Sequence, residues 1–404
     1  MSADGAGLLL PVGTRLLHIG PQKTGTTAVQ GAFHSNRAAL AEHGVHYAGK
    51  TRQPRPAAAA VVLGTALPGF PADSVDRWPA LVEEVRTSSA DRVVISAEMF
   101  ANAGEAAART VVEAFDANRT RVVITLRPLA KIMPSQWQQF IQSGAHMSYA
   151  EFLDAMLDQP RDTSEHTQAF WHRHRHDELI ERWAGVVGPD NVTVIAIDDR
   201  ERRMLLDTFE LLLGLPQGLL AYDTKSNSSL SLTETEVFRE FNRQFFLDKQ
   251  WPEEVHAAAA RYGMATYLKN EPTLACEEPI ATPAWALRRA DEIAVEMTTA
   301  IRRSGVHVIG ALQDLRHLTD DAPDDVAAID EVPVEVAARA VMGVVWHTTM
   351  ARTPRSRRPG TMGAKAPAAK SSKPATGPTT DELTSAQLVG VVAGRARRRI
   401  TRST

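Results

Sequence analysis

Two hydrophobic patterns alternate along the first half of the chain. Short apolar, β-branched runs such as 92–96 predict buried strands, and longer amphipathic runs predict helices. Because the strands alternate with helices, the sequence predicts an α/β fold: a P-loop-like, three-layer α/β/α domain with a mainly parallel central sheet. The predicted strands are 16–19, 45–47, 92–96, 120–126 and 191–197, and the predicted helices are 26–42, 57–67, 78–88, 105–117, 136–142, 170–187 and 203–213.

The second half of the chain is mainly helical by the same criteria. The clearest helices are 233–246, where Thr233 and Glu236 fit a capping box, and 285–304, followed by a terminal helix over 334–348. We expect the helical additions of about 250–330 to cover the cleft in which an acceptor binds.

Polar side chains follow three of the predicted strands at the point where each strand ends. Lys23, Glu98 and Arg127 each lie just beyond a buried strand. In parallel sheets the ligand lies at the carboxyl ends of the strands. The sequence therefore predicts a functional site at that edge of the sheet.

The turn after the first strand has the composition of an anion-binding loop. It combines two glycines with a lysine and three threonines, and it leads directly into a helix. Its backbone N–H groups and the helix N-terminus are expected to hold a phosphate-like anion, with Lys23 adding a positive charge and the threonines adding hydroxyl donors. The residues of this loop are Gly20, Pro21, Gln22, Lys23, Thr24, Gly25, Thr26 and Thr27.

The loop differs from that of nucleoside triphosphatases. Those enzymes place Lys-Ser/Thr directly after the second glycine, whereas Lys23 here precedes Gly25. The serine or threonine that would bind Mg²⁺ is missing from the required register, so we expect no metal requirement. His172 and His176 lie one helical turn apart, but without an evident third ligand they predict a solvated surface rather than a metal site.

A second anion site is predicted after the strand 120–126. Arg127 ends that strand, and Ser135 follows eight residues later, where it is expected to cap or open the helix 136–142. Taken singly, Arg127 could form a surface ion pair and Ser135 could be only a helix cap. Their joint occurrence downstream of the loop favours a ligand with two anionic groups.

These motifs resemble those of sulfotransferases that use 3′-phosphoadenosine 5′-phosphosulfate (PAPS). The loop 20–27 is similar to their 5′-phosphosulfate loop, most closely in the heparan sulfate N-sulfotransferase branch and its bacterial relatives, and the resemblance extends over about 14–245. It implies that Arg127 and Ser135 bind the 3′-phosphate. It also implies that Asn227 and Ser229 belong to a late loop that closes over the co-substrate.

The resemblance implies sulfuryl transfer to a hydroxyl or amine of a carbohydrate, glycolipid or small metabolite. That acceptor needs a general base. Glu98 is the first candidate, with an ion-pair or capping carboxylate as the alternative, and His46 is the second. His18 lies within a strand and is expected to be a hydrogen-bonded core histidine.

Two other functions compete with sulfuryl transfer. One is a small-molecule kinase with a deviant phosphate loop, for which Asp198 would hold Mg²⁺. The other is a non-catalytic anion-binding module. The combination of Lys23, Arg127 and Ser135 favours a sulfotransferase over both.

Composition and charge indicate how the chain divides into segments. The 404 residues contain one cysteine, which excludes a disulfide framework. We expect a flexible N-terminus over 1–13, a catalytic domain over 14–350 and a disordered basic tail over 351–404, which carries 12 Lys and Arg against 2 Asp and Glu. No leader or membrane-spanning run is visible, so we expect a cytoplasmic protein without a nucleic-acid partner, whose tail has at most weak contact with anionic surfaces.

Overall fold

A computed structural model describes residues 7–66, 70–158, 164–222, 229–271, 279–317, 319, 321–329 and 331–350. The chain divides into two compact units, 1–352 and 353–404. The second unit, and with it the disorder predicted for the tail, lies outside the described residues. Leu10 and Gly13, which the sequence assigns to a flexible N-terminus, instead donate backbone hydrogen bonds to Leu212 (2.9 Å) and Asp91 (2.6 Å).

Six strands within the described residues form one parallel sheet in the order β2-β3-β1-β4-β5-β6, which confirms the predicted fold class. β1 lies near the centre, and every residue in it is buried, as in a parallel sheet covered on both faces. Only β6 was not predicted, because this short strand is partly exposed and lacks a continuous apolar run. The strands are β1 (Arg15–Gly20), β2 (Val45–Tyr47), β3 (Arg92–Ser96), β4 (Thr120–Leu126), β5 (Val192–Ala196) and β6 (His307–Ile309).

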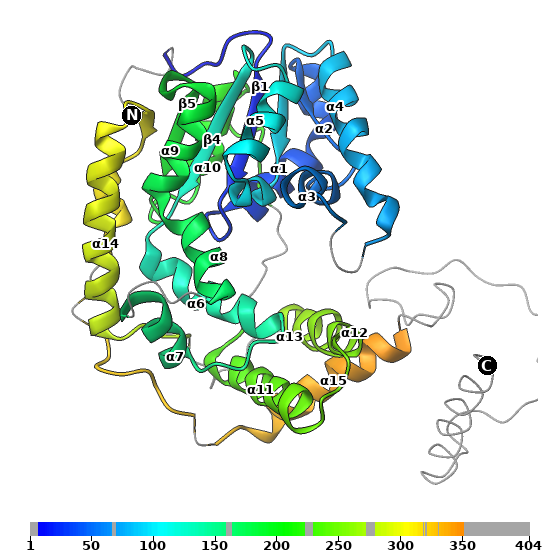
Figure 1. Cartoon of the computed structure of the whole chain (residues 1–404), viewed down its shortest axis with the longest axis vertical. Helices are drawn as coiled ribbons and strands as arrows, with labels where there is room; N and C mark the ends of the chain where they lie inside the picture. The colour runs from blue at the N-terminus through cyan, green and yellow to red at the C-terminus, as the bar shows by residue number, and fades with distance from the viewer. Residues whose placement is uncertain are drawn as a thin grey trace, which may run out of the picture. The chain divides into compact units, whose positions relative to one another are not determined.

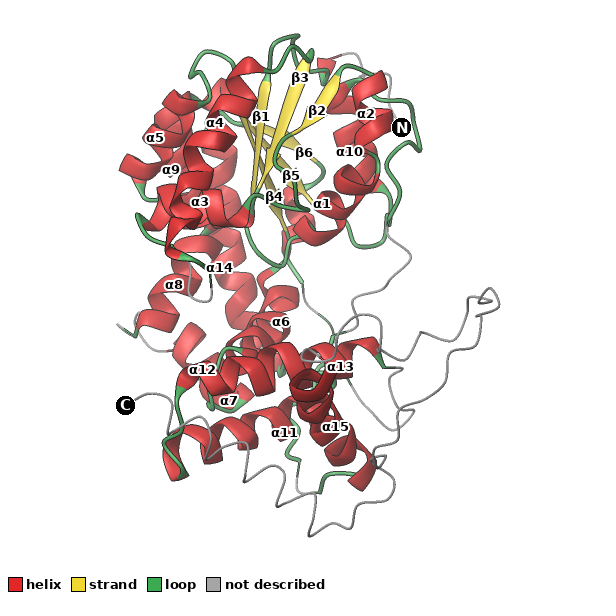
Figure 2. Ribbon diagram, turned by 90° about the vertical axis from the view of Figure 1, so that its right-hand side faces the viewer, coloured by secondary structure: helices red, strands yellow, loops and turns green. Residues whose placement is uncertain are grey.

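Helices cover both faces of the sheet (Figures 1 and 2). One face packs against α3 (Arg55–Leu63), α4 (Arg77–Thr87), α5 (Glu105–Ala114) and α9 (His176–Val187) through a core that includes Val85, Val111 and Trp183. The other face packs against α1 (Thr26–Ser35) and α10 (Met204–Leu213), with α2 (Arg37–Glu42) beside them. These layers leave the carboxyl ends of the strands available for ligands.

The helical additions have a hydrophobic core of their own. Trp137, Phe152, Phe170, Phe238 and Met297 are among its buried members. Within the described residues, no helix is both long enough and apolar enough to cross a bilayer. The helices are α6 (Leu129–Gln142), α7 (Tyr149–Leu153), α8 (Glu165–His174), α11 (Leu232–Arg243), α12 (Glu253–His256), α13 (Ala265–Asn270), α14 (Ala284–Arg303) and α15 (Val334–Met350), and wider helical turns, η6 (Gln244–Asp248) and η7 (Ala257–Met264), join some of them.

Three predicted helix boundaries were wrong, each for a local reason. The helix predicted over 26–42 breaks at Asn36, whose side chain donates to the carbonyl oxygen of Ala32 (2.8 Å) and closes α1. The helix predicted over 170–187 breaks at Arg175, between α8 and α9. The capping box of α11 is formed by Ser231 and Glu234, not by Thr233 and Glu236.

Candidate active site

The loop 20–27 turns sharply between β1 and α1. Gly20, Lys23 and Gly25 all have positive φ, of 85°, 68° and 80°. At Gly25 the positive φ favours glycine, and a Cβ there would come within 2.6 Å of Leu205 Cδ2 and push that side chain aside. Lys23 adopts the left-handed conformation that side chains usually avoid, a local strain often found at ligand sites. The loop therefore presents the N-terminus of α1 as an anion-binding position.

The threonines of the loop do not share one role. Thr24 was expected to offer its hydroxyl to an anion, but it is fully buried and donates to the carbonyl oxygen of Pro21 (2.6 Å). The Thr24 hydroxyl also lies 2.7 Å from that of Thr125 on β4. Thr24 therefore holds the loop in shape. Thr26 donates to Glu98, and Thr27 is exposed.

Glu98 stands directly beside the loop, in the turn that follows β3. Its Oε2 accepts a hydrogen bond from Thr26 Oγ1 at 2.8 Å. A Cβ built on Gly20 would lie 3.3 Å from Glu98 Cβ, which shows how closely the carboxylate-bearing turn approaches the loop. Burial lowers the pKa of Lys23, and the negative charge of Glu98 opposes that shift. The structure thus brings together Lys23, Thr26 and Glu98, as the strand ends predicted.

Arg173 on α8 is a second cation near Glu98, and sequence reasoning missed it. Its side chain is buried, and its Nη1 donates to Asn102 Oδ1 (3.1 Å). Burial lowers the pKa of Arg173 to about 10, and Glu98 opposes this shift as well. A guanidinium within a charged helical segment gives no sequence signal that distinguishes it from a surface residue.

Helix α6 connects the loop to the second anion site. Gln139 Nε2 donates to Gln22 Oε1 at 3.0 Å, so this face of α6 is turned toward the loop. Lys131, Ser135 and Gln139 are spaced by four residues and share that face. Ser135 was expected to cap a helix, but α6 begins at Leu129 and places Ser135 in its interior. Pro134 misled the prediction, since a proline usually marks the first turn of a helix.

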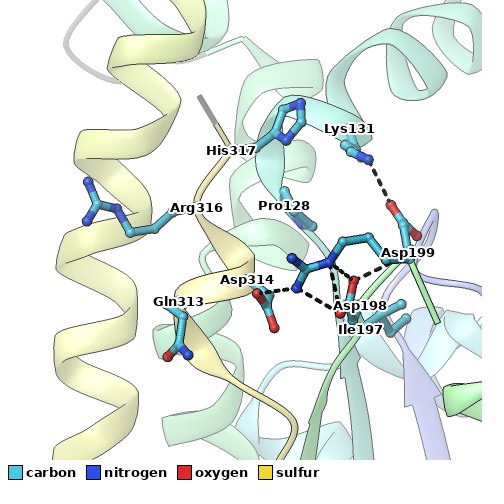
Figure 3. Close-up of a pocket in the computed structure, with 10 residues that line it drawn as sticks. Pro128, Lys131, Ile197, Asp198, Asp199, Gln313, Asp314, Arg316 and His317 are labelled. Atoms are coloured by element: carbon cyan, nitrogen blue, oxygen red, sulfur yellow. Dashed lines mark hydrogen bonds and ion pairs between the residues drawn. The ribbon is translucent and has the colours of Figure 1, made fainter. Parts of the chain in front are cut away.

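Arg127 and Lys131 meet on one carboxylate oxygen. Asp199 Oδ2 accepts from Arg127 Nε (3.1 Å) and Nη2 (3.0 Å), and it lies 3.3 Å from Lys131 Nζ. All three side chains are about one third exposed. Lys131 and Asp199 line a cavity of about 300 Å³ at the carboxyl ends of β4 and β5 (Figure 3). The Asp199 Oδ2 atom therefore lies where the same two cations could hold an oxygen of an external anion.

Lys269 reaches α6 from the helical additions. Its Nζ donates to Gln142 Oε1 (2.8 Å), and Gln142 lies one turn beyond Gln139 on α6. Burial, together with the positive charges of Lys23 and Arg261, lowers the pKa of Lys269 to about 8. Sequence reasoning missed this lysine, because its place depends on packing between segments far apart in the chain.

Of two histidines that the sequence singled out, His46 lies away from the loop, whereas His18 lies in the core next to it, with Nε2 3.4 Å from Thr125 Oγ1. His46 on β2 is level with Val93 on β3, which pairs with Arg15 at the start of β1. That register puts His46 about five residues, or roughly 16 Å, from the carboxyl edge of the sheet, and its Nε2 lies 2.9 Å from Glu84. His18 is a hydrogen-bonded core residue, as expected, with Nδ1 2.8 Å from Ser96 Oγ.

The remaining candidates also lie away from the loop or fall outside the described residues. His172 and His176 belong to different helices, and His176 is fully buried, so the solvated helical surface expected there was wrong. Asn227 lies outside the described residues, and Ser229 is exposed just after that gap. Among the described residues, no three His, Cys, Asp or Glu side chains are grouped so that they could hold a metal ion.

Comparison with known proteins gives a match among solved structures but none among family models or curated proteins. A scan against protein-family models finds no match. A search of curated proteins also finds none. Among solved structures, a sulfotransferase from Alicyclobacillus acidocaldarius is similar, with a TM-score of 0.38 and 14% identity over 59% of this chain and 95% of that one. The sheet order and the helices on both faces by themselves define the fold of this chain, a three-layer α/β/α domain around a parallel sheet.

Proposed function

We propose that the protein is a sulfotransferase that moves a sulfuryl group from PAPS to a hydroxyl or amine by in-line displacement. One observation carries the proposal: Lys23 lies in an anion-binding loop with Glu98 beside it, and α6 links this loop to a second cationic position at Arg127. A ligand with anionic groups at its 5′ and 3′ positions matches that pair of positions. The resemblance of the loop sequence to the 5′-phosphosulfate loop supports the same conclusion.

The residues present fit such a co-substrate. The loop backbone and Lys23 would hold its 5′-phosphate, and Arg127, with Ser135 on the loop-facing side of α6, would hold its 3′-phosphate. Asp199 supports this assignment, because its carboxylate oxygen already receives hydrogen bonds or an ion pair from Arg127 and Lys131. PAPS, when bound, supplies a sulfuryl group activated by its phosphate leaving group.

The chain's own residues would then perform three tasks. Lys23 neutralises negative charge at the 5′-phosphate, which matters most as that charge grows during transfer. Glu98 accepts the proton of the acceptor, and Thr26 holds the carboxylate through its 2.8 Å hydrogen bond. Lys269 and Arg173 are positioned to keep the approach to this site positive, which favours anionic ligands.

The kinase alternative depends on Asp198, whose carboxylate is already held by Arg200. Arg200 Nε lies 2.8 Å from Asp198 Oδ1, and Nη2 lies 2.8 Å from Oδ2. Binding of Mg²⁺ at Asp198 would require this pair to separate. The geometry therefore favours the sulfotransferase, and the non-catalytic alternative is decided by assay.

The experiment that tests the proposal is a thermal-shift comparison followed by an activity assay. We expect stabilisation by 3′-phosphoadenosine 5′-phosphate (PAP), weaker stabilisation by AMP, and none beyond AMP by ATP with Mg²⁺. Stabilisation by ATP with Mg²⁺ alone would support the kinase. PAP binding without any PAPS turnover, across hydroxyl and amine acceptors, would support the non-catalytic module.

A further inference from the structure

A row of buried polar side chains crosses the sheet just before its carboxyl edge. His18 on β1, Ser96 on β3 and Thr125 on β4 are fully buried, and each comes two residues before a residue of the candidate site. His18 Nδ1 lies 2.8 Å from Ser96 Oγ, and His18 Nε2 lies 3.4 Å from Thr125 Oγ1. Because β1 lies between β3 and β4, the imidazole joins two strands that do not pair with each other.

The row continues from β4 into the anion-binding loop. Thr125 Oγ1 lies 2.7 Å from Thr24 Oγ1, and Thr24 donates to the carbonyl oxygen of Pro21 at 2.6 Å. Thr24 directly follows Lys23, whose φ of 68° is a strained conformation for a residue with a side chain. Such strain persists only where the surrounding structure holds it. The buried row supplies a contact of that kind.

The two threonine hydroxyls have a defined direction of donation. Thr24 uses its one hydroxyl proton on Pro21, so the 2.7 Å contact requires Thr125 to donate to Thr24. The Thr125 hydroxyl also lies 3.3 Å from the carbonyl oxygen of Gly20, which is a longer and weaker contact. The Thr125 oxygen therefore has no proton left for a third partner and can only accept from it.

This direction determines the tautomer of His18. Burial lowers the pKa of His18 to about 3, so near neutral pH the ring carries a single proton. Since Thr125 can only accept from the ring, Nε2 carries that proton and donates it. Nδ1 then accepts from the Ser96 hydroxyl, whose oxygen accepts from Gln30 Nε2 (3.3 Å) on α1.

We infer that His18 is a positioning residue for the proposed sulfuryl transfer: its Nε2–H tautomer acts through Thr125 and Thr24 to fix the backbone that carries Lys23. The inference rests on the proposed function. In this role His18 contacts no ligand. Small displacements of a group that stabilises the transition state reduce the rate of a reaction more than they reduce ground-state binding.

Thr125→Val tests the inference, because valine keeps the shape of threonine and removes the hydroxyl. We expect kcat for PAPS to fall by about ten- to a hundredfold, while calorimetry shows a far smaller loss of PAP affinity. Thr125→Ser retains the hydroxyl and should restore most of the rate. Melting temperatures check that each variant is folded.

Thr120→Val is the matched control. Thr120 is equally buried on the same strand, but its hydroxyl donates to the carbonyl oxygen of Asp116 (2.9 Å) at the amino end. This variant should lose stability as Thr125→Val does and keep its turnover. A rate that both valine variants reduce alike, or that neither reduces, would overturn the positioning role alone. Absence of PAPS turnover in the unaltered chain would defeat the proposed function and the positioning role with it.

The tautomer is measured without any activity assay. Nitrogen-15 spectra of the histidine-labelled chain at neutral pH distinguish a ring protonated at Nε2 from one protonated at Nδ1, and the signal that disappears in His18→Gln belongs to His18. We expect the proton on Nε2. A proton on Nδ1 would reverse the direction of donation and overturn the inference, even in a fully active enzyme.

Discussion

The two anion-binding ends of the candidate site are built differently. At the loop end, Lys23 is half-buried, and burial lowers its pKa. At the other end, Arg127 and Lys131 are about one third exposed and both already pair with the single carboxylate of Asp199. A half-buried charge on a backbone fixed by Thr24 is suited to stabilising a change in charge during a reaction, because it needs little rearrangement. A partly exposed ion pair can exchange its carboxylate for the phosphate of a ligand, so this end is suited to binding.

Glu98→Gln gives the largest effect expected from this comparison. Glutamine keeps the hydrogen bond to Thr26 but cannot accept a proton, so turnover of the acceptor should fall by about 10²–10⁴-fold. Affinity for PAP, measured by calorimetry, should stay nearly unchanged. Glu84→Gln is the matched control, because Glu84 contacts His46 at the far end of the strands. Unaltered turnover in the Glu98 variant would make that carboxylate structural.

Lys23→Ala should reduce turnover by about 10²–10³-fold, the usual cost of removing one group that stabilises developing charge. Because Lys23 already meets charge in the ground state, PAP affinity should fall too, but by far less. Steady-state rates and calorimetry on the same preparation measure the two losses. If affinity fell as much as turnover, the loop end would be a binding site only, and the contrast between the two ends would disappear.

The loop end should also respond to acid. Burial lowers the pKa of His18 to about 3, so the folded protein holds this ring neutral. An unfolded chain takes up a proton near pH 6.5, so His18 should make stability fall as the pH falls from about 6.5 toward 3, by about 1.4 kcal/mol for each pH unit. Urea titrations across that range should show a shallower dependence for His18→Gln. An equal slope in both proteins would contradict the assignment.

The sequence predicted the fold and one half of the site for the same reason. Strands such as β3 and β4 are largely apolar runs, and a charged residue within two positions of each strand end, Glu98 or Arg127, lies at the carboxyl edge of the sheet whatever the loops do. Contacts between distant elements gave no such signal. Gln139 contacts the loop only because α6 packs beside it, and Lys269 reaches α6 only because α13 packs nearby.

The orientation of side chains was harder to predict than their position. Thr24 lies in the loop as expected, yet the backbone turns its hydroxyl inward to Pro21 and Thr125. Ser135 lies on the expected helix, but seven residues into it, because α6 continues through Pro134. Both differences depend on local backbone geometry that composition and spacing do not determine.

Arg127→Ala tests the binding end. A charge-assisted hydrogen bond contributes about 1.5–3 kcal/mol, so PAP affinity should weaken by roughly tenfold or more. AMP, which lacks a 3′-phosphate, should bind both proteins equally weakly. Calorimetry with the two nucleotides provides the measurement, and Arg121→Ala, at an exposed hydrogen-bonding position on the amino half of β4, is the control. An equal loss for AMP would move the contact away from the 3′-phosphate.

Asp199→Asn should have the smallest effect of these variants, and the direction of that effect distinguishes two roles for the carboxylate. An asparagine cannot neutralise Arg127 and Lys131, so both cations would be released to an incoming phosphate. Because exposed ion pairs contribute about 0.2–1 kcal/mol, PAP affinity should rise by only about two- to fivefold, with more effect at low salt than at high salt. Asp314→Asn changes another carboxylate on the same cavity, one that pairs with Arg200 instead, and should leave PAP affinity unchanged. A weaker affinity in the Asp199 variant would mean that the carboxylate orients the two cations for the ligand rather than competing with it. The binding end would then be preorganised in the same way as the loop end.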